Sequence, residues 1–396
     1  MSLPISEYQA RLQRLRSHMA EESFDLFLVY GDEYRREHLR YVSNYWPIFE
    51  RGMLVVGLTG DPVLLVAPEC FHYARETSVW NDLRIVKEME MAYVADQIEY
   101  SGESIYTTLG TVFHDILEGN NPKKVGVCGF DAMSVITLEA IQRAAAGAAV
   151  QNADRVIYGM RLIKSPVEVG ALRRVWQICD VGYKAILDAD LVGLTEIQAA
   201  AIGEKAARDA GAEHIVFSIF TTGERTNTVI GRASEKVIQR GDMVMSCLAV
   251  QYDGYIATDE WPFVAGGDPT PEQFDLIRHL INAEQLGIQM VRDGVIAGEV
   301  VRKIRDYFAE NGLTRYDLYP PIHGNGLAEA ESPYPDEHTP YAFKKGMGVN
   351  FDVSLFGLPG VGSNRVEEGF VVDEGGMIIL SDLISQLRAD FLKQHP

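Results

Sequence analysis

The sequence has few cysteines and no long uninterrupted apolar run. Its four cysteines, Cys70, Cys128, Cys179 and Cys247, are far apart and form no C-x-x-C pair, so they indicate neither a disulfide framework nor a zinc knuckle. The apolar stretch at 53–67 is broken by glycines, an aspartate and a proline, and the N-terminal segment lacks the apolar core of a signal peptide. We therefore expect a cytoplasmic protein from a reducing compartment, with no membrane contact.

Basic residues are also scarce. Lys and Arg number 36 against 56 Asp and Glu, which gives a formal net charge of −20. A charge of that sign and size repels phosphate backbones and anionic lipid surfaces. The composition therefore argues against nucleic acid as a partner and favours a small cationic or zwitterionic molecule.

What remains is an ordinary globular composition, 47% hydrophobic and 23% charged over 396 residues, enough for two or three domains. The first part alternates helical periodicity with short β-rich runs, which is typical of an α/β unit. The segments are a helix at 5–22, strands at 26–30, 53–56 and 63–66, a helix at 106–117 and a strand at 125–128. We predict an N-terminal α/β domain at 1–155.

A helix start with a clear mechanism marks the next domain. Ser165 can cap a helix whose first position is Pro166, where the missing backbone N–H costs nothing. From this point the pattern changes to longer helices. We predict a second domain at 160–396.

The second domain repeats its own pattern of two helices, a glycine, and a Gly-led strand. Three glycine pairs recur in order, at offsets of 101, 105 and 108 residues: Gly211 and Gly312, Gly241 and Gly346, Gly254 and Gly362. Such periodic recurrence predicts two related halves about a pseudo-twofold axis. Pockets favour the interfaces between such units, so we expect the site where the halves meet.

Polar residues occupy matching places in these halves. His323 lies in a Gly-rich segment, Asp352 interrupts an apolar strand, and Glu367 follows in the next one. A buried carboxylate without a partner is costly, so Asp352 needs either a function or a structural hydrogen bond. The candidate cluster is these three residues with Glu260 or Asp259.

Together these segments resemble the creatinase/aminopeptidase P/prolidase superfamily. The resemblance rests on five short motifs in the right order, at 161–168, 241–244, 254–255, 323–327 and 365–368. It implies an α/β N-terminal domain followed by an α+β pita-bread domain with an internal pseudo-twofold repeat. It also implies a homodimer.

The metallopeptidases of that superfamily hold metal with five ligands, in the order Asp, Asp, His, Glu, Glu. The resemblance puts Cys247 and Thr258 at the two Asp positions and leaves His323, Asp352 and Glu367 at the others. A dinuclear centre needs several oxygen ligands around both ions. With two of them replaced, we expect no metal and no other cofactor.

An alternative keeps one ion. A one-residue bulge in the strand would bring Asp259 into the site beside His323, Asp352 and Glu367. Four ligands suffice for a single divalent metal such as Mn, Co or Zn. The protein would then be a mononuclear Xaa-Pro dipeptidase or aminopeptidase.

The departures otherwise resemble creatinase, the metal-independent member, which has a glutamate where Glu260 stands. In a strand Thr258 and Glu260 share a face and Asp259 points away. Glu260, Asp352 and Glu367 would bind a cationic nitrogen group through charge-assisted bonds, with His323 as general acid and base. This reading predicts a metal-independent hydrolase of a C–N bond in a small guanidino, amidino or amide compound.

The resemblance suggests further substrate-binding residues. Phe49 and Arg51 match the creatinase Phe-x-Arg that reaches across the dimer, and Arg225 and Tyr255 are additional candidates. A core ring or a surface ion pair explains Phe49, Arg51 and Arg225 equally well. No histidine occurs in 222–231, and Ala330 stands where the peptidases have a second one. A non-catalytic binding descendant of the family therefore stays open.

Overall fold

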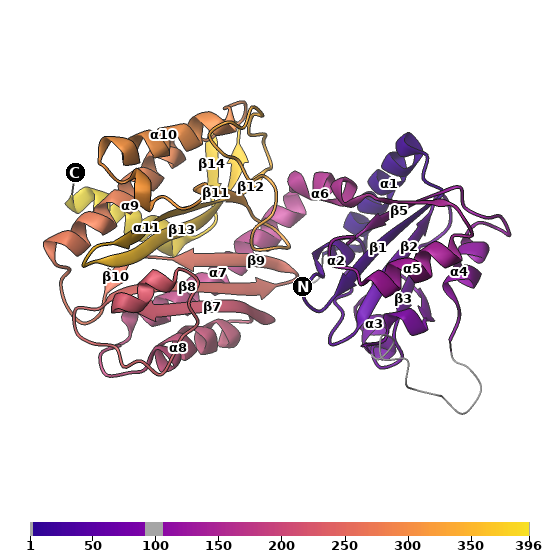
Figure 1. Ribbon diagram of the computed structural model, residues 1–396, viewed down its shortest axis with the longest axis horizontal. Coiled ribbons are helices and arrows are strands. Elements are labelled where there is room, and N and C mark those ends of the chain that lie inside the picture. The colour runs from indigo at the N-terminus through magenta and orange to yellow at the C-terminus, as the bar shows by residue number, and fades with distance from the viewer. Residues whose placement is uncertain (1–2, 92–105, 396) are drawn as a thin grey trace. The chain divides into compact units, whose positions relative to one another are not determined.

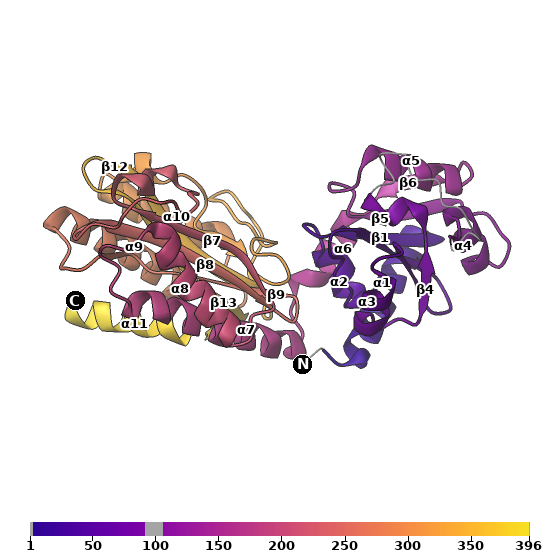
Figure 2. The same cartoon turned by 90° about the horizontal axis from the view of Figure 1, so that it is seen from below.

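The computed structural model describes residues 3–91 and 106–395. The chain divides into two compact units, Met1–Arg161 and Leu162–Pro396 (Figures 1 and 2). Among the helices of the described residues, none combines the length and the apolar character needed to cross a bilayer.

The first unit is a mixed sheet of six strands flanked by helices. The sheet order is β4-β3-β2-β1-β5-β6, with β1 antiparallel to β2 and parallel to β5. The strands are β1 (Leu26–Asp32), β2 (Arg51–Gly57), β3 (Val63–Val66), β4 (Asp82–Ile85), β5 (Lys124–Cys128) and β6 (Ala149–Asn152). The helices are α1 (Ile5–Glu22), α2 (Glu37–Ser43), α3 (Phe71–Thr77), α4 (Leu109–Ile116), α5 (Val135–Ala144) and α6 (Asp154–Leu162). The expected α/β class is confirmed.

Helix α1 shows how local sequence sets this unit. Leu12, Leu15 and Met19 recur at helical spacing and are buried, so one face of the helix packs inward. The helix stops at Ser23, which adopts a left-handed conformation, and the N–H of Phe24 bonds back to the carbonyl of Met19.

The second unit is built on an eight-stranded sheet. Its path is β10-β8-β9-β13-β12-β11, with β7 beside β8 and β14 beside β13. The strands are β7 (His214–Thr222), β8 (Met243–Tyr252), β9 (Tyr255–Glu260), β10 (Phe263–Val264), β11 (Ile322–Gly324), β12 (Gly348–Leu358), β13 (Gly362–Asp373) and β14 (Gly376–Ile379). The helices are α7 (Pro166–Asp188), α8 (Glu196–Asp209), α9 (Pro271–Met290), α10 (Ala297–Glu310) and α11 (Asp382–Gln394). Helix α7 packs on β8 and β9, and α9 packs on β12 and β13 (Figure 1).

The predicted repeat is visible in this sheet. Helices α7 and α8 precede the β8–β9 hairpin, and α9 and α10 precede the β12–β13 hairpin. Gly254 and Gly362 turn the two hairpins with φ of 86° and 106°, values that side-chain-bearing residues rarely adopt. Strand β9 pairs with β13 where the hairpins meet. The pita-bread architecture with its pseudo-twofold repeat is therefore confirmed.

The predicted helix start is also present. The Ser165 hydroxyl accepts a bond from the N–H of Glu168, and the Glu168 carboxylate accepts one from the N–H of Ser165, with Pro166 in the first turn. This capping box satisfies two backbone N–H groups that the first turn of α7 would otherwise leave without partners.

Candidate active site

Four side chains form a row across the four central strands of the second unit. Cys247 on β8 faces Glu260 on β9, Glu260 faces Glu367 on β13, and Glu367 faces Asp352 on β12. Directly opposed residues on neighbouring strands point to the same face of a sheet with their Cβ atoms about 5 Å apart. Strand pairing thus gathers three carboxylates and a thiol from residues spread over more than a hundred positions.

His323 joins this row from β11. It pairs with Asn350 on β12, and its Nε2 lies 3.2 Å from Oε1 of Glu367. The side-chain amide of Asn350 also donates to Oε1 of Glu367 at 2.7 Å, and Asn325 donates to Asn350 in turn. These contacts orient the Glu367 carboxylate toward His323. The structure therefore brings together Glu260, Asp352, Glu367 and His323.

A buried guanidinium lies between two of the carboxylates. Arg365 Nε is 3.0 Å from Oε2 of Glu260, and its Nη1 is 3.8 Å from Oδ2 of Asp352. The same side chain donates to the hydroxyl of Tyr319 and to the carbonyl of Val229. Arg365 opens the motif at 365–368, and in the structure it is the cation that pairs with two carboxylates of the row.

Burial and crowding shift the pKa values in this row. Burial raises the pKa of Glu260 well above its usual range, although Arg365 opposes the shift. Burial likewise raises the pKa of Glu367 to about 7, against the hydrogen bond from His323. Burial alone would lower the pKa of His323, but Glu367, Glu329 and Asp352 raise it to about 10. Glu367, with a pKa of about 7, can therefore gain or lose a proton near neutral pH.

Two predicted residues lie on the other face of β9. The register between β8 and β9 is regular from Cys247 to Tyr252, so the bulge that would turn Asp259 into the site does not exist. Asp259 instead lies against Asp180 of α7, and burial followed by that charge raises its pKa well above its usual range. The prediction of Asp259 as a metal ligand is wrong because of this regular strand geometry.

Tyr255 shares the helix-facing side with Asp259. Its hydroxyl donates to Oε1 of Glu168 on α7 at 2.9 Å, and its side chain is buried there. The prediction of Tyr255 as a substrate-binding residue is therefore wrong. The tyrosine anchors α7 to the sheet instead.

The wall beside the row is apolar. Cys247 packs in a buried cluster with Ile219, Met245 and Phe356, and Phe217, Val229 and Tyr319 lie against it. Burial, followed by the charges of Glu260 and Glu367, raises the pKa of the Cys247 thiol well above its usual range. A thiol held protonated in this way is no nucleophile at neutral pH. Thr258 shares the face of Glu260 and is buried.

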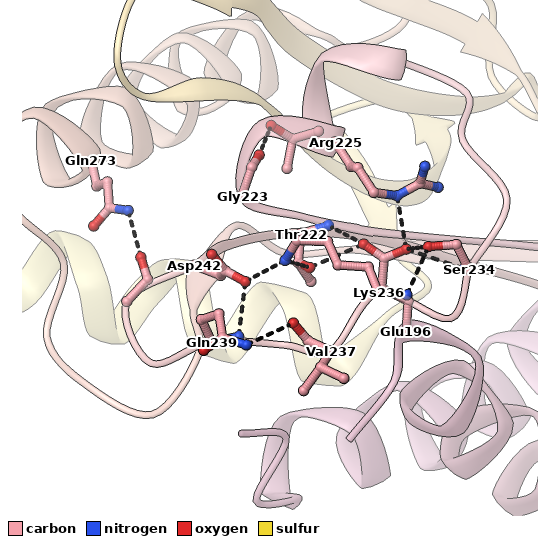
Figure 3. Close-up of polar contacts among 12 residues, drawn as sticks. Glu196, Thr222, Gly223, Arg225, Ser234, Lys236, Val237, Gln239, Asp242 and Gln273 are labelled. Atoms are coloured by element: carbon pink, nitrogen blue, oxygen red, sulfur yellow. Dashed lines mark hydrogen bonds and ion pairs between the residues drawn. The ribbon is translucent and has the colours of Figure 1, made fainter. Parts of the chain in front are cut away.

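Arg225 belongs to a different network (Figure 3). Its Nε lies 3.0 Å from Oε2 of the buried Glu196, which also accepts bonds from Thr222 and Ser234. Its Nη2 donates to the carbonyl of Arg232. The structure does not bring Arg225 to the carboxylate row, and its substrate-binding role stays a prediction. It ties the loop after β7 to the start of α8.

Phe49 and Arg51 lie in the first unit. Phe49 is exposed and has a φ of 67°, and Arg51 opens β2 and donates to the carbonyl of Glu90. Their role toward substrate, and the homodimer that the role requires, stay predictions.

Two residues that sequence reasoning missed lie beside His323. Glu329 has Oε1 at 3.7 Å from His323 Nε2, and the ring of Tyr334 stacks on the imidazole with centroids 6.0 Å apart. Both follow β11 in the chain. Glu329 directly precedes Ala330, which stands where the peptidases of the superfamily have a second histidine. That departure was the one signal in the sequence that pointed to this segment.

Two groups of side chains in the row have the spacing of metal ligands. Cys247, Glu260 and Glu367 form one, and His323, Asp352 and Glu367 form the other, each with ligand atoms within 4.8 Å of one another. The second group supplies one nitrogen and two carboxylates, a donor set suited to a divalent transition metal. Within the described residues, Oδ1 of Asp352 is buried and has no hydrogen-bond partner, as expected of a ligand atom. The residues fit one ion there, whereas Arg365 competes for Glu260 in the first group.

Comparison with known proteins identifies the class. Residues 170–374 match metallopeptidase family M24, and residues 11–163 match the creatinase/prolidase N-terminal domain. The first of these matches covers more than half of the chain, and the chain belongs to family M24. The expected superfamily and the expected hydrolase acting on C–N bonds are thereby confirmed.

Individual relatives agree with that class. The chain is 26% identical over 367 residues to the uncharacterized peptidase YqhT of Bacillus subtilis, covering 92% of this chain and 96% of the relative. It is 25% identical over 368 residues to an Xaa-Pro dipeptidase of Pyrococcus furiosus, with the same coverage. The crystal structure of the Pyrococcus horikoshii prolidase superposes with a TM-score of 0.80 at 21% identity, over 94% of this chain and 98% of that one.

These findings correct two expectations. The prediction of no cofactor is wrong, because the family is one of metallopeptidases and two groups in the row have metal-ligand spacing. The finer resemblance to metal-independent creatinase is not supported, since the relatives carry peptidase names. The prediction of no metal gave weight to the two ligands lost at Cys247 and Thr258. It gave too little weight to His323, Asp352 and Glu367, which the fold keeps together.

Proposed function

We propose that this protein hydrolyses the C–N bond of an Xaa-Pro type dipeptide at a site holding one divalent metal ion. The observation that carries the proposal is the group of His323, Asp352 and Glu367, whose ligand atoms converge within 4.8 Å. The similarity to an Xaa-Pro dipeptidase over 92% of the chain supports the substrate class.

The roles follow from position. His323, Asp352 and Glu367 would hold the ion, which when bound supplies Lewis acidity and lowers the pKa of coordinated water. Glu260 is the remaining carboxylate of the row, and its Oε2 faces Arg365. With its pKa raised by burial, Glu260 can carry a proton at Oε1, the oxygen that is not paired with Arg365, between water and the leaving nitrogen.

Arg365 and the apolar wall complete this account. Arg365 fixes Glu260 through an ion pair and is itself anchored on Val229 and Tyr319, so the proton-carrying carboxylate cannot drift. The cluster of Ile219, Phe356 and Tyr319 forms an apolar wall beside the row, and such a wall suits the ring of a proline substrate.

The test is turnover of alanyl-proline after loading with Mn²⁺, Co²⁺ or Zn²⁺. We expect cleavage that a chelator abolishes, that Asp352→Asn lowers by at least about 100-fold and that Asp259→Asn leaves within about threefold. Asp259→Asn is the matched control because it makes the same chemical change on the helix-facing side of the sheet. Cleavage that survives both the chelator and Asp352→Asn would contradict the proposal.

A further inference from the structure

We propose that Glu329 and Tyr334 form a subsite for the cationic amino group of the substrate. The inference rests on the proposed function and names a recognition element within the same site. The subsite would select ligands with a free ammonium group over otherwise identical ligands that lack it.

The first step is the position of Glu329 at the solvent side of the row. Its side chain is 24% exposed, against 2% for Glu367 and 10% for Asp352. Glu329 is nevertheless close to the buried groups, since its Oε1 lies 3.7 Å from His323 Nε2. A ligand entering from solvent therefore meets this carboxylate before it reaches the others.

The second step is that the Glu329 carboxylate has no close hydrogen-bond donor among the described residues. Among the described residues, its carboxylate has one ion-pair partner, the His323 imidazole, and accepts no hydrogen bond. Glu331, two residues later, is different: it accepts from Nζ of Lys164 at 2.7 Å and from the N–H of Ala328. Glu331 is thus held by bonds within the protein, whereas Glu329 is available to a ligand.

The third step is the aromatic surface next to it. The ring of Tyr334 stacks on His323 at an interplanar angle of 17°, and this tyrosine is 51% exposed. Burial raises the pKa of the Tyr334 hydroxyl, and the negative charges of Asp352, Glu329 and Glu367 add to the shift, so the ring lies within their field. A carboxylate beside an accessible aromatic ring is a favourable environment for an ammonium ion.

Glu329 is also separate from the residues that would hold the ion. It is absent from both groups with metal-ligand spacing, so it is not needed as a ligand. Its carboxylate is therefore available to a substrate group that lies beside the ion.

The experiment compares two uncleavable ligands on the metal-loaded protein by titration calorimetry. One is the ketomethylene analogue of alanyl-proline, in which carbon replaces the scissile nitrogen, and the other is its desamino counterpart. We expect the wild type to prefer the amine by about 10-fold to 100-fold, because charge-assisted bonds are worth that much. Glu329→Gln should bring the two affinities within about twofold.

Matched variants separate the roles. Glu310→Gln removes the same charge from an exposed position at the end of α10 and should keep the preference. Tyr334→Phe should retain it, and Tyr334→Leu should reduce it, because only the ring is required. Thermal unfolding of each variant checks that the fold is intact.

The outcomes are distinguishable from those of the proposed function. Equal affinity of the wild type for both ligands, or a preference unchanged in Glu329→Gln, overturns the subsite even if alanyl-proline is cleaved. A preference lost in Glu329→Gln supports the subsite even if no Xaa-Pro dipeptide is cleaved. In the latter case the proposed function fails and the amine-binding subsite stands.

Discussion

Glu260 and Glu367 lie opposite each other on β9 and β13, at the pairing that joins the two halves of the sheet. Each half thus contributes one carboxylate to the same place, and Cys247 and Asp352 extend the row on either side. The site exists only when the two halves are paired. The glycine repeat reveals the two halves, and it therefore also predicts that the site lies where they pair.

Removing the guanidinium of Arg365 should destabilise the protein. Arg365→Met leaves Glu260 buried without its cation, and breaking a buried ion pair from one side costs about 3–5 kcal/mol. We expect the free energy of unfolding in urea to fall by that order and Arg365→Met/Glu260→Gln to recover part of it. An additive double variant would show that the two side chains are not coupled.

A second buried acid, on the helix-facing side of the sheet, predicts a pH dependence of stability. Glu284 on α9 lies 3.7 Å from Arg388 of α11, which also contacts Glu368, and burial raises the pKa of Glu284 to about 7. In the unfolded chain this carboxyl ionises near its usual pKa of about 4.5. Its contribution to stability is therefore complete below that value and is lost as pH rises toward 7.

The measurement compares wild type and Glu284→Gln in urea at pH 5 and pH 8. The glutamine cannot ionise, so the variant has no such pH-dependent contribution to lose. From pH 5 to pH 8 the free energy of unfolding of the wild type should therefore fall by about 1–3 kcal/mol relative to that of the variant. Parallel pH profiles would contradict the raised pKa of Glu284.

Restoring a family ligand should change the metal content. Cys247→Asp puts a carboxylate beside Glu260 and Glu367, and oxygen donors suit divalent ions better than a protonated thiol does. We expect bound metal to rise from about one toward two equivalents, with Cys247→Ser as the isosteric control that stays at one. If Cys247→Asp also stays at one equivalent, Arg365 and not the missing carboxylate excludes the second ion.

Local signals in the sequence were enough for much of the fold. Helix α1, the Ser165–Pro166 helix start and the paired glycines depend on capping, periodicity and positive φ, which are properties of short segments. Strand alternation also placed Glu260 and Asp259 on opposite faces of β9. The competing bulge could be excluded only once the register with β8 was known.

Tertiary contacts decided the rest. Arg365 reaches Val229 and Tyr319, and Tyr255 reaches Glu168, across distances in sequence that no periodicity reveals. Glu329 lies in an irregular segment after β11, where the alternation rule does not apply. These side chains became site or structural residues through packing between segments.

The most direct test of the account is the metal content of the purified protein, measured by elemental analysis after dialysis without a strong chelator. We expect about one equivalent of a divalent transition metal in the wild type and in Asp259→Asn. Asp352→Asn, which removes a ligand from the group with His323 and Glu367, should fall well below one equivalent. A wild type without metal after loading, or an Asp352→Asn variant that retains a full equivalent, would contradict the account.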